Sequence, residues 1–235
     1  MTTPLRQRRR AAATREILDA AGDHIASHGP AGLSLRAVAR SLGMTVQALY
    51  HYFPSRDELV TALITEAYHD LADAVQAALD ATAAPERHRF VVAAEGYRTW
   101  AVENVSRFQL LYGTPLPHYR APADGRTTDG ARRLGSVLIR ELFAGCTDDQ
   151  LARADFPTLS TEMRTRFDEL PPESMAALPP PAVAVFISSW GHMHGLVVLE
   201  AFGHTSFIAP VQAELFRESM RNLVTDMHRR IPQAQ

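Results

Sequence analysis

The chain of 235 residues contains no lysine and a single cysteine, Cys146. One cysteine cannot form an intramolecular disulfide, which excludes a disulfide-stapled secreted scaffold, and we expect Cys146 to be inert packing rather than a redox sensor. The basic start, MTTPLRQRRR, lacks the apolar segment that follows it in a signal peptide, so we expect a cytoplasmic protein. All 24 basic residues are arginine, which fits a high-GC coding bias and also suits phosphate binding by a rigid guanidinium fork.

Common enzyme motifs are also missing. The sequence has no Gly-rich phosphate loop, no nucleophile elbow and no acid pair spaced for acid–base catalysis. We therefore assign no catalytic residue and no cofactor, while a helical enzyme with scattered catalytic residues stays open as an alternative. His192, His194 and His204 invite a metal interpretation, but their spacing differs from the i, i+4 pair used for zinc and no further ligand completes a site. We expect no metal.

Positive charge is concentrated near the N-terminus. Residues 1–56 carry eight arginines and three acidic residues, a net charge of +5, whereas residues 57–235 carry sixteen arginines and twenty-three acidic residues, a net charge of −7. The near-neutral net charge of −2 therefore combines a basic segment, residues 1–56, with an acidic segment, residues 57–235. This asymmetry indicates that the basic segment alone binds a polyanionic partner.

Apolar residues recur at helical spacing almost throughout, and we predict an all-α fold. A first helix ends at His28-Gly29-Pro30, and a second begins at Ser34 and ends near Leu42. A third helix, capped by Thr45, extends to about Tyr52, and a capping box at Ser55 begins a long helix that ends near residue 81. Later helices are expected at 86–112, 126–145, 182–203 and 210–230, and the prolines within 170–181 predict an extended connector.

The segment 182–199 has no charged side chain unless a histidine protonates, and it is long enough to raise the question of a membrane span. Ser188, Ser189, Gly191, His192 and His194 lie in its middle, where hydrocarbon would leave polar groups unsatisfied. We interpret the segment as a helix buried between other helices or in a subunit interface, and we predict no membrane partner.

The second and third helices form a helix-turn-helix candidate on the basic segment. Ala39 is small where the two helices would pack, Gly43 can adopt the left-handed turn conformation, and Val46 and Leu49 would face inward. The outer face of the third helix then carries Thr45, Gln47, Ala48 and His51. A glutamine there can pair with adenine, a threonine can contact a base or a phosphate, and an alanine can meet a thymine methyl group.

These residues resemble the DNA-binding domain of the TetR family of transcriptional regulators. The resemblance is carried by ILDAA (17–21), HG (28–29), LSLRAVA (33–39), LGMTVQALYHYF (42–53) and SRDELV (55–60). The stretch Trp190 to Gly195, with Leu199-Glu200 and Gly203-His204, resembles the Trp-His-Gly type of C-terminal domain found in a subset of the family. The resemblance implies an arm and a three-helix helix-turn-helix domain over 1–56, and a helical effector-binding and dimerisation domain over 57–235. The helix from about residue 55 would link the two.

Carried over by position, the resemblance places Ser34 and Arg36 at phosphates, Tyr50 at the DNA backbone, and Thr45, Gln47 and His51 in the major groove. Arg56 stands where the family usually has lysine, and it is expected to keep the phosphate contact because the charge and the helix N-terminal amides both remain. Tyr52 stands where histidine is frequent and Gln47 where a small residue is common, so the operator sequence stays open. The arginines before the first helix are interpreted as a flexible arm that binds DNA, with a solubilising tail as the alternative. They are Arg6, Arg8, Arg9 and Arg10.

The C-terminal domain is expected to hold an effector pocket. Trp190 and His194 lie four residues apart on one helical face, and Tyr97, Trp100 and Tyr112 lie on helices that would surround such a cavity. Core packing is the alternative for each. The last two helices would pair with their copies in a four-helix dimer interface. Its candidate residues are Phe186, Leu196, Leu199, Leu215, Phe216 and Leu223.

The sequence therefore predicts a homodimeric repressor that binds a pseudo-palindromic, double-stranded DNA operator in the nucleoid and is released by a small-molecule effector. A DNA-binding helical dimer without an effector stays open as the main alternative. Neither the identity of the effector nor the operator follows from the sequence.

Overall fold

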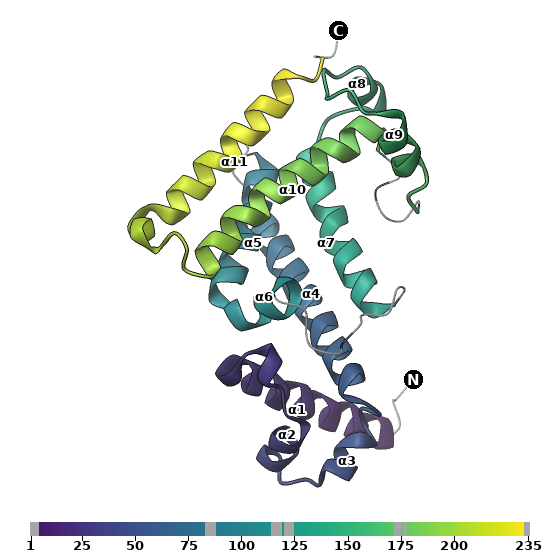
Figure 1. The fold of residues 1–235 in the computed structure, drawn as a ribbon, viewed down its shortest axis with the longest axis vertical. Coiled ribbons are helices and arrows are strands. Elements are labelled where there is room, and N and C mark those ends of the chain that lie inside the picture. The colour runs from purple at the N-terminus through teal and green to yellow at the C-terminus, as the bar shows by residue number, and fades with distance from the viewer. Residues whose placement is uncertain are drawn as a thin grey trace. The chain divides into compact units, whose positions relative to one another are not determined.

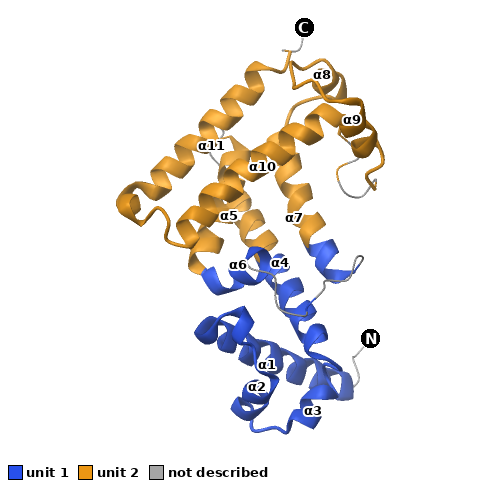
Figure 2. Ribbon diagram, viewed as in Figure 1, with its two compact units in different colours: residues 1–70, 104–130 blue, residues 71–103, 131–235 orange. Residues whose placement is uncertain are grey.

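The computed structural model describes residues 5–82, 88–113, 119, 125–171, 175 and 178–232. These residues form helices and turns without any strand (Figure 1), which confirms the all-α prediction. The chain divides into two compact units (Figure 2). Unit 1 comprises Met1–Asp70 and Asn104–Gly130, and unit 2 comprises Leu71–Glu103 and Ala131–Gln235. These units are discontinuous in sequence, whereas the predicted border between residues 56 and 57 divides the chain once and stays a prediction.

Unit 1 contains three N-terminal helices, and α1 packs against α2, which packs against α3. The unit also contains the first part of a long helix, α4, and a short helix, α6. The elements are α1 (Leu5–His28), the 3-10 turn η1 (Pro30–Gly32), α2 (Leu35–Ser41), α3 (Val46–Tyr50), α4 (Arg56–Ala81) and α6 (Val105–Tyr112). Their core is a cluster in which Ile17 and Ile25 of α1 and Leu49 of α3 are almost fully buried.

The caps and the turn of the helix-turn-helix follow the predictions. Ser34 caps α2 by accepting a hydrogen bond from the N–H of Ala37 (3.4 Å), and Thr45 caps α3 by accepting one from the N–H of Ala48 (3.1 Å). Gly43 has a φ of +65°, the left-handed conformation that glycine adopts at little cost. The third helix ends at Tyr50, two residues earlier than predicted.

The predicted flexible arm is wrong. Residues 5–10 are the first turns of α1, so Arg6, Arg8, Arg9 and Arg10 belong to a continuous helix that ends at His28. Arginine and alanine are both good helix formers, and the run RRRAAA contains no proline or glycine to interrupt the helix. The apolar stripe begins only at Ile17, which is why hydrophobic periodicity places the helix start too late.

Unit 2 is built around α5 (Arg89–Glu103), against which α10 (Pro180–Ala201) and α11 (Gln212–Arg229) pack. Gly96 allows close packing of α5 against the second half of α4, because a Cβ atom there would lie 2.8 Å from the Cβ atom of Ala78. The remaining elements are α7 (Arg126–Leu142), whose first residues, 126–130, belong to unit 1, α8 (Asp148–Ala152), α9 (Thr161–Asp168) and the 3-10 turn η2 (Ser206–Val211).

Two predicted stretches differ from the structure. The helix expected over 86–112 is interrupted at Asn104, whose backbone (φ −124°, ψ 46°) is not helical, and this break separates α5 from α6. No helix is predicted between residues 147 and 169, yet α8 and α9 form there, each capped by a hydroxyl side chain, Thr147 and Ser160 respectively. Local capping thus produces helices where the apolar pattern is weak. The connector predicted within 170–181 lies partly outside the described residues.

Helix α10 corresponds to the apolar segment predicted from sequence. By length and composition alone it could cross a membrane, but a core helix of a soluble protein passes the same test. Val183, Met193 and Val197 on this helix are almost fully buried within unit 2. One face of α10 packs against α5 and α11, but only 33% of its most apolar window is buried within the protomer.

Candidate functional site

The helix-turn-helix presents a polar outer face on α3. Thr45, Gln47 and His51 are exposed and Tyr50 is 40% exposed, whereas Leu49 is fully buried. Val46 packs against the core, as predicted, and Ala48 is half-buried. The side chains that can contact a groove of DNA thus lie on one side of a short helix whose other side is anchored.

Groups suited to phosphate lie at the starts of the neighbouring helices. Arg36 is exposed in the first turn of α2, directly after its cap, Ser34. Arg56 is the first residue of α4 and is half-buried, and its helix start is capped by Ser55, whose hydroxyl accepts from the N–H of Glu58 (3.1 Å). Arg40, in the last turn of α2, is a further exposed arginine that the sequence analysis did not single out.

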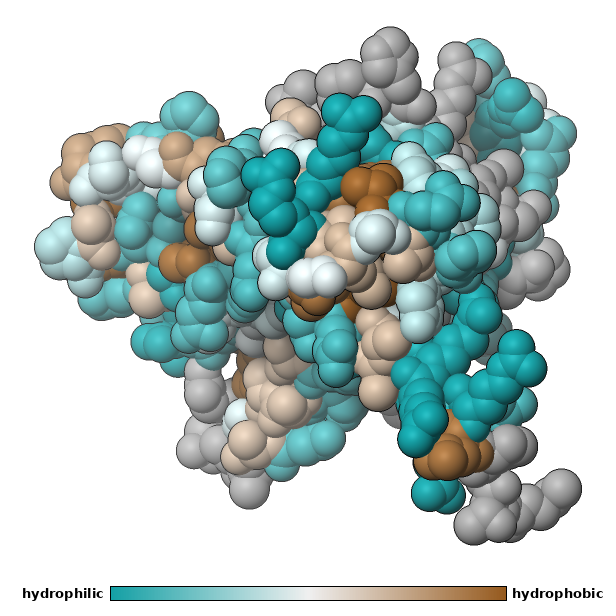
Figure 3. Space-filling view, turned by 90° about the horizontal axis from the view of Figure 1, so that it is seen from below, coloured by the Kyte–Doolittle hydropathy of each residue, from teal (hydrophilic) through white to brown (hydrophobic). Residues whose placement is uncertain are grey.

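The first turns of α1 and the end of α3 enclose a groove of about 700 Å³. Arg10 joins its two sides, because its Nη2 atom donates to the carbonyl oxygen of His51 (3.3 Å) and its guanidinium lies 5.7 Å from the ring centroid of Tyr52. The groove is lined by Leu5, Arg6, Arg9, Arg10, Ala48, His51 and Tyr52. Arg8 is exposed on α1 and is not among these residues. Seen from below, hydrophilic side chains surround small apolar patches (Figure 3).

Three of the predicted effector residues form a cluster in unit 2. The hydroxyl of Tyr97, on α5, lies 2.8 Å from Nδ1 of His194, on α10, and the imidazole stacks on the indole of Trp190 with ring centroids 5.1 Å apart. Burial lowers the pKa of His194, which favours the neutral imidazole. The cluster thus combines a stacked aromatic pair with a polar contact between α5 and α10.

The other two predicted effector residues lie on α5 and α6. Trp100 is on α5, as Tyr97 is, and is buried. Tyr112 belongs to unit 1, where its ring contacts Tyr68 (centroids 6.0 Å apart) and Phe108 (5.3 Å). The spacing of Trp190 and His194 was a usable sequence signal, whereas the bond between Tyr97 and His194 joins positions 97 residues apart and had none.

Ion pairs tie α5 to the two C-terminal helices. Arg98 pairs with Glu200 of α10, and Arg217 of α11 pairs with Glu95 (Nε–Oε1 2.5 Å). The guanidinium of Arg98 also lies 6.0 Å from the ring centroid of Phe216. These contacts place Phe216 inside the protomer, where it is 3% exposed.

The predicted dimer residues therefore fall into two groups. Phe186 and Phe216 are buried within the protomer, and Leu196 and Leu223 are half-buried. Leu199 on α10 and Leu215 on α11 are 42% and 47% exposed, together with Ile187, Phe207 and Val211 on the same two helices and the turn between them. These exposed apolar side chains lie on the two helices for which the sequence predicts a dimer interface and on the turn between them.

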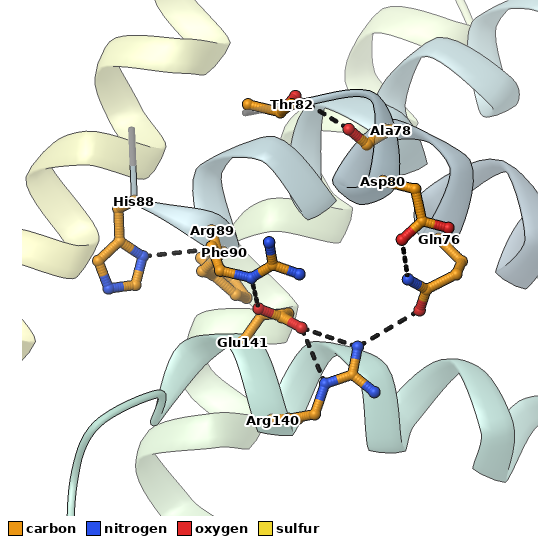
Figure 4. Close-up of polar contacts among 9 residues, drawn as sticks. All are labelled: Gln76, Ala78, Asp80, Thr82, His88, Arg89, Phe90, Arg140 and Glu141. Carbon is orange, nitrogen blue, oxygen red and sulfur yellow. Dashed lines mark hydrogen bonds and ion pairs between the residues drawn. The ribbon is translucent and has the colours of Figure 1, made fainter. Parts of the chain in front are cut away.

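A second polar network lies at the start of α5 (Figure 4). Glu141, buried near the end of α7, accepts from Nε of Arg89 (2.7 Å) and Nε of Arg140 (2.8 Å), and Arg140 also donates to Gln76 (3.3 Å). Burial alone would raise the pKa of Glu141, but the two arginines hold it below its usual value. Both carboxylate oxygens of Glu141 accept from an arginine, and through Arg140 and Gln76 the network links α4, α5 and α7.

The metal and cysteine interpretations can be compared with the described part of the chain. There, no three side chains of histidine, cysteine, aspartate or glutamate gather in a way that could hold a metal ion. Burial raises the pKa of the Cys146 thiol, which disfavours the reactive thiolate.

The chain matches models of one protein family over both units. Residues 17–63 match the model described as "Bacterial regulatory proteins, tetR family", and residues 90–223 match the model described as "Tetracyclin repressor-like, C-terminal domain". The resemblance to the Trp-His-Gly type is a finer assignment and stays a prediction.

Relatives and solved structures agree with these matches. HTH-type transcriptional regulator Rv1816 of Mycobacterium tuberculosis is 38% identical over 189 residues, 80% of each chain. The crystal structure of the regulatory protein SCO4313 has a TM-score of 0.74 at 32% identity, over 94% of this chain and 98% of that one. A TetR variant from Acinetobacter baumannii, in complex with minocycline, shares the fold with a TM-score of 0.54 at 16% identity, over 92% and 97%.

The matched relatives are transcriptional regulators rather than enzymes, in agreement with the absence of catalytic motifs. The helix-turn-helix of unit 1 and the helical unit 2 correspond to the two regions that the family models describe. The chain belongs to the TetR family of bacterial transcriptional regulators, and DNA binding is the activity that this membership implies.

Proposed function

We propose that the protein is a homodimeric repressor that binds a pseudo-palindromic operator and is released by a small-molecule effector bound in unit 2. The observation that carries the proposal is the exposed polar face of α3 beside an arginine-lined groove. Its partner is double-stranded DNA, which places the protein in the cytoplasm, at the nucleoid.

The residues of α3 divide the recognition of DNA between bases and backbone. Gln47 is exposed and can form a bidentate contact with adenine, while His51 and the methyl group of Thr45 can line the major groove. Thr45 keeps its hydroxyl proton for donation, because its oxygen only accepts from Ala48 in the cap. Tyr50, Ser34, Arg36 and Arg56 are suited to phosphate contacts, which position the helix without selecting a sequence.

The surface of α10 and α11 supports a dimer. Leu199 and Leu215 are large apolar side chains exposed on the two C-terminal helices, where the sequence predicts a four-helix interface. A two-fold axis between two copies would present two recognition helices to half-sites about one helical turn of DNA apart, so the operator should be a pseudo-palindrome.

The cluster of Tyr97, Trp190 and His194 supports an effector site. It joins α5 to α10, so a ligand that contacts it can change the packing of the helix proposed to form the dimer interface. A ligand shifts such an equilibrium only by its difference in affinity for the DNA-binding and released states, typically about 1–3 kcal/mol.

A second candidate is a DNA-binding dimer without an effector. One observation favours it: Tyr97 is fully buried and its hydroxyl already has a partner inside the protein, as expected of a core residue. A library of small aromatic and cationic compounds separates the two candidates, because a ligand that binds only the folded state raises the melting temperature. Stabilisation that is lost in the Trp190→Ala variant would favour the effector site, and no stabilisation by any compound would favour the second candidate.

Selection of duplexes from a random DNA pool at near-physiological salt tests the proposed function. We expect enrichment of a pseudo-palindrome by the wild type and a changed preference in the Gln47→Ala variant. Tyr50→Ala should instead weaken binding to all sequences. Absence of enrichment, both before and after the protein is refolded to remove any co-purified ligand, would refute sequence-specific binding.

A further inference from the structure

We propose that the groove between the first turns of α1 and the end of α3 is a second DNA contact, which binds the sugar–phosphate backbone flanking the bases at α3. The inference rests on the proposed function and extends it: the operator footprint would include flanking backbone held by a rigid helix. A flexible arm would bind without a defined position, whereas a helix holds its side chains in a fixed register.

Helical geometry places three arginines on the groove side of α1. Arg6, Arg9 and Arg10 have the spacing i, i+3, i+4, which puts them on one face, and all three line the groove. Arg8 is two residues after Arg6, about 200° around the helix from it at 3.6 residues per turn. Arg6, Arg9 and Arg10 therefore line the groove, whereas Arg8 does not.

The chemistry of the groove fits a nucleic-acid backbone. Its charged lining residues are arginines, and no acidic residue is among those that line it. Leu5, Ala48 and Tyr52 add apolar surface that can pack against deoxyribose. Arg6 and Arg9 are about 4.5 Å apart along the helix axis, from the rise of 1.5 Å per residue, so their long side chains can contact neighbouring phosphates of one strand.

Arg10 has a different role from Arg6 and Arg9. Its guanidinium donates to the carbonyl of His51, directly after α3, and lies over the ring of Tyr52. It is therefore a positioning residue that fixes the end of α3 against α1, and it also contributes positive charge to the groove. Removal of Arg10 should loosen the register of α3 and reduce discrimination between operator bases.

The test compares alanine variants of neighbouring arginines, because each substitution removes the same charge and only the position differs. Arg9→Ala, the double variant Arg6→Ala/Arg9→Ala and the control Arg8→Ala are each titrated with the selected operator over a range of salt concentrations. Each lost phosphate contact should lower the slope of log affinity against log salt by about 0.9. Because the proposed dimer carries each substitution twice, we expect a reduction of about 1.8 for Arg9→Ala and about 3.6 for the double variant, with little change for Arg8→Ala.

The same proteins are then titrated with a duplex that ends at the selected bases. Removal of the flanks should weaken the wild type and Arg8→Ala but leave the double variant unchanged. Equal effects of Arg8→Ala and Arg9→Ala, or equal loss on flank removal for all variants, would overturn the inference while operator binding itself still stands. A wild type that binds no duplex would refute the proposed function, and this inference with it.

The positioning role of Arg10 is measured on single-base operator variants. Arg10→Ala should narrow the affinity ratio between the operator and these variants by about tenfold, which a lost phosphate contact alone would not do. Arg10→Lys keeps a cation and a donor and should restore part of the ratio. An unchanged ratio in Arg10→Ala, with the thermal midpoint also unchanged, would overturn the positioning role.

Discussion

At the scale of single residues, His88 couples the start of α5 to the end of α11. Its Nδ1 atom accepts a hydrogen bond from the N–H of Phe90 (3.2 Å; Figure 4), which requires an unprotonated nitrogen. Its ring centroid is 5.0 Å from that of His228. Burial, followed by the nearby His228, lowers the pKa of His88 to about 4, against the opposing effect of Glu141. The neutral imidazole is therefore part of the folded structure of unit 2.

This shift predicts acid sensitivity. Between about pH 6.5 and pH 4 the unfolded chain binds a proton at His88 that the folded chain does not, so the free energy of unfolding should fall as the pH is lowered through this window. The full shift corresponds to about 3.4 kcal/mol; because His88 is half-exposed, we expect about 1–2 kcal/mol. Urea denaturation at pH 7.5, 6, 5 and 4.5 measures the effect.

The matched comparison for this prediction uses two histidine variants in unit 2. His88→Gln should reduce the fall in the free energy of unfolding between pH 6.5 and pH 4.5, whereas His204→Gln, at an exposed position, should leave the fall as in the wild type. A wild type whose stability does not change in this window, or an identical fall in His88→Gln, would contradict the role of His88.

At the scale of elements, local signals predict the helix-turn-helix well and the ends of other helices poorly. The caps Ser34 and Thr45 and the turn at Gly43 are sequence-local, and the structure has all three where the pattern indicates. The start of α1 lies twelve residues before its first buried residue, Ile17, so no apolar periodicity marks it. The added first turns of α1 are instead held by contacts that are distant in sequence, between Arg10 and the residues that follow α3, His51 and Tyr52.

Two glycine substitutions in unit 1 can distinguish the effect of backbone conformation on stability from the effect of steric space around the new side chain. A Cβ atom at Gly43 or at Gly22 would meet no atom within 4 Å, but only Gly43 has a left-handed backbone. Gly43→Ala should therefore destabilise the protein by about 1–2 kcal/mol. Gly22→Ala, inside α1, should stabilise it by up to about 1 kcal/mol. Chemical denaturation of both variants measures the difference.

Operator binding by the same variants tests whether the turn also positions α3. Gly43→Ala should weaken specific binding, because the left-handed turn sets the angle between α2 and α3, while Gly22→Ala should bind as the wild type does. If both substitutions shifted stability in the same direction, the conformational argument would be wrong.

At the scale of the whole molecule, the same apolar pattern can mean a protomer core or a subunit interface. Six residues of the last two helices are predicted for the dimer interface, yet Phe186 and Phe216 are buried within the protomer. Leu199 and Leu215 are exposed instead. Hydrophobic periodicity cannot separate the buried residues from the exposed ones, because a protomer core and a subunit interface both favour apolar residues at helical spacing. Only the tertiary packing against α5 decides which of these side chains remain exposed.

The exposed pair yields a prediction for the assembly. Leu199→Glu/Leu215→Glu should prevent dimerisation, because it would place four charges in an interface that otherwise buries four leucines. Full burial of each leucine contributes about 1.5–3 kcal/mol, so the dimer dissociation constant should rise at least about 100-fold. Analytical ultracentrifugation over a concentration series measures this constant. Met163→Glu is the control, since Met163 is 44% exposed on α9 and is not among the predicted interface residues.

Operator binding should follow the assembly state. A monomer engages one half-site, so the double variant should lose most of its affinity for the full operator while the Met163→Glu control keeps it. The affinity of the double variant for an isolated half-site should equal that of the wild-type protomer, because its recognition helix is unchanged. A double variant that remains dimeric would place the interface on another surface. A wild type that is monomeric at the concentrations needed for operator binding would remove the physical basis for a palindromic site.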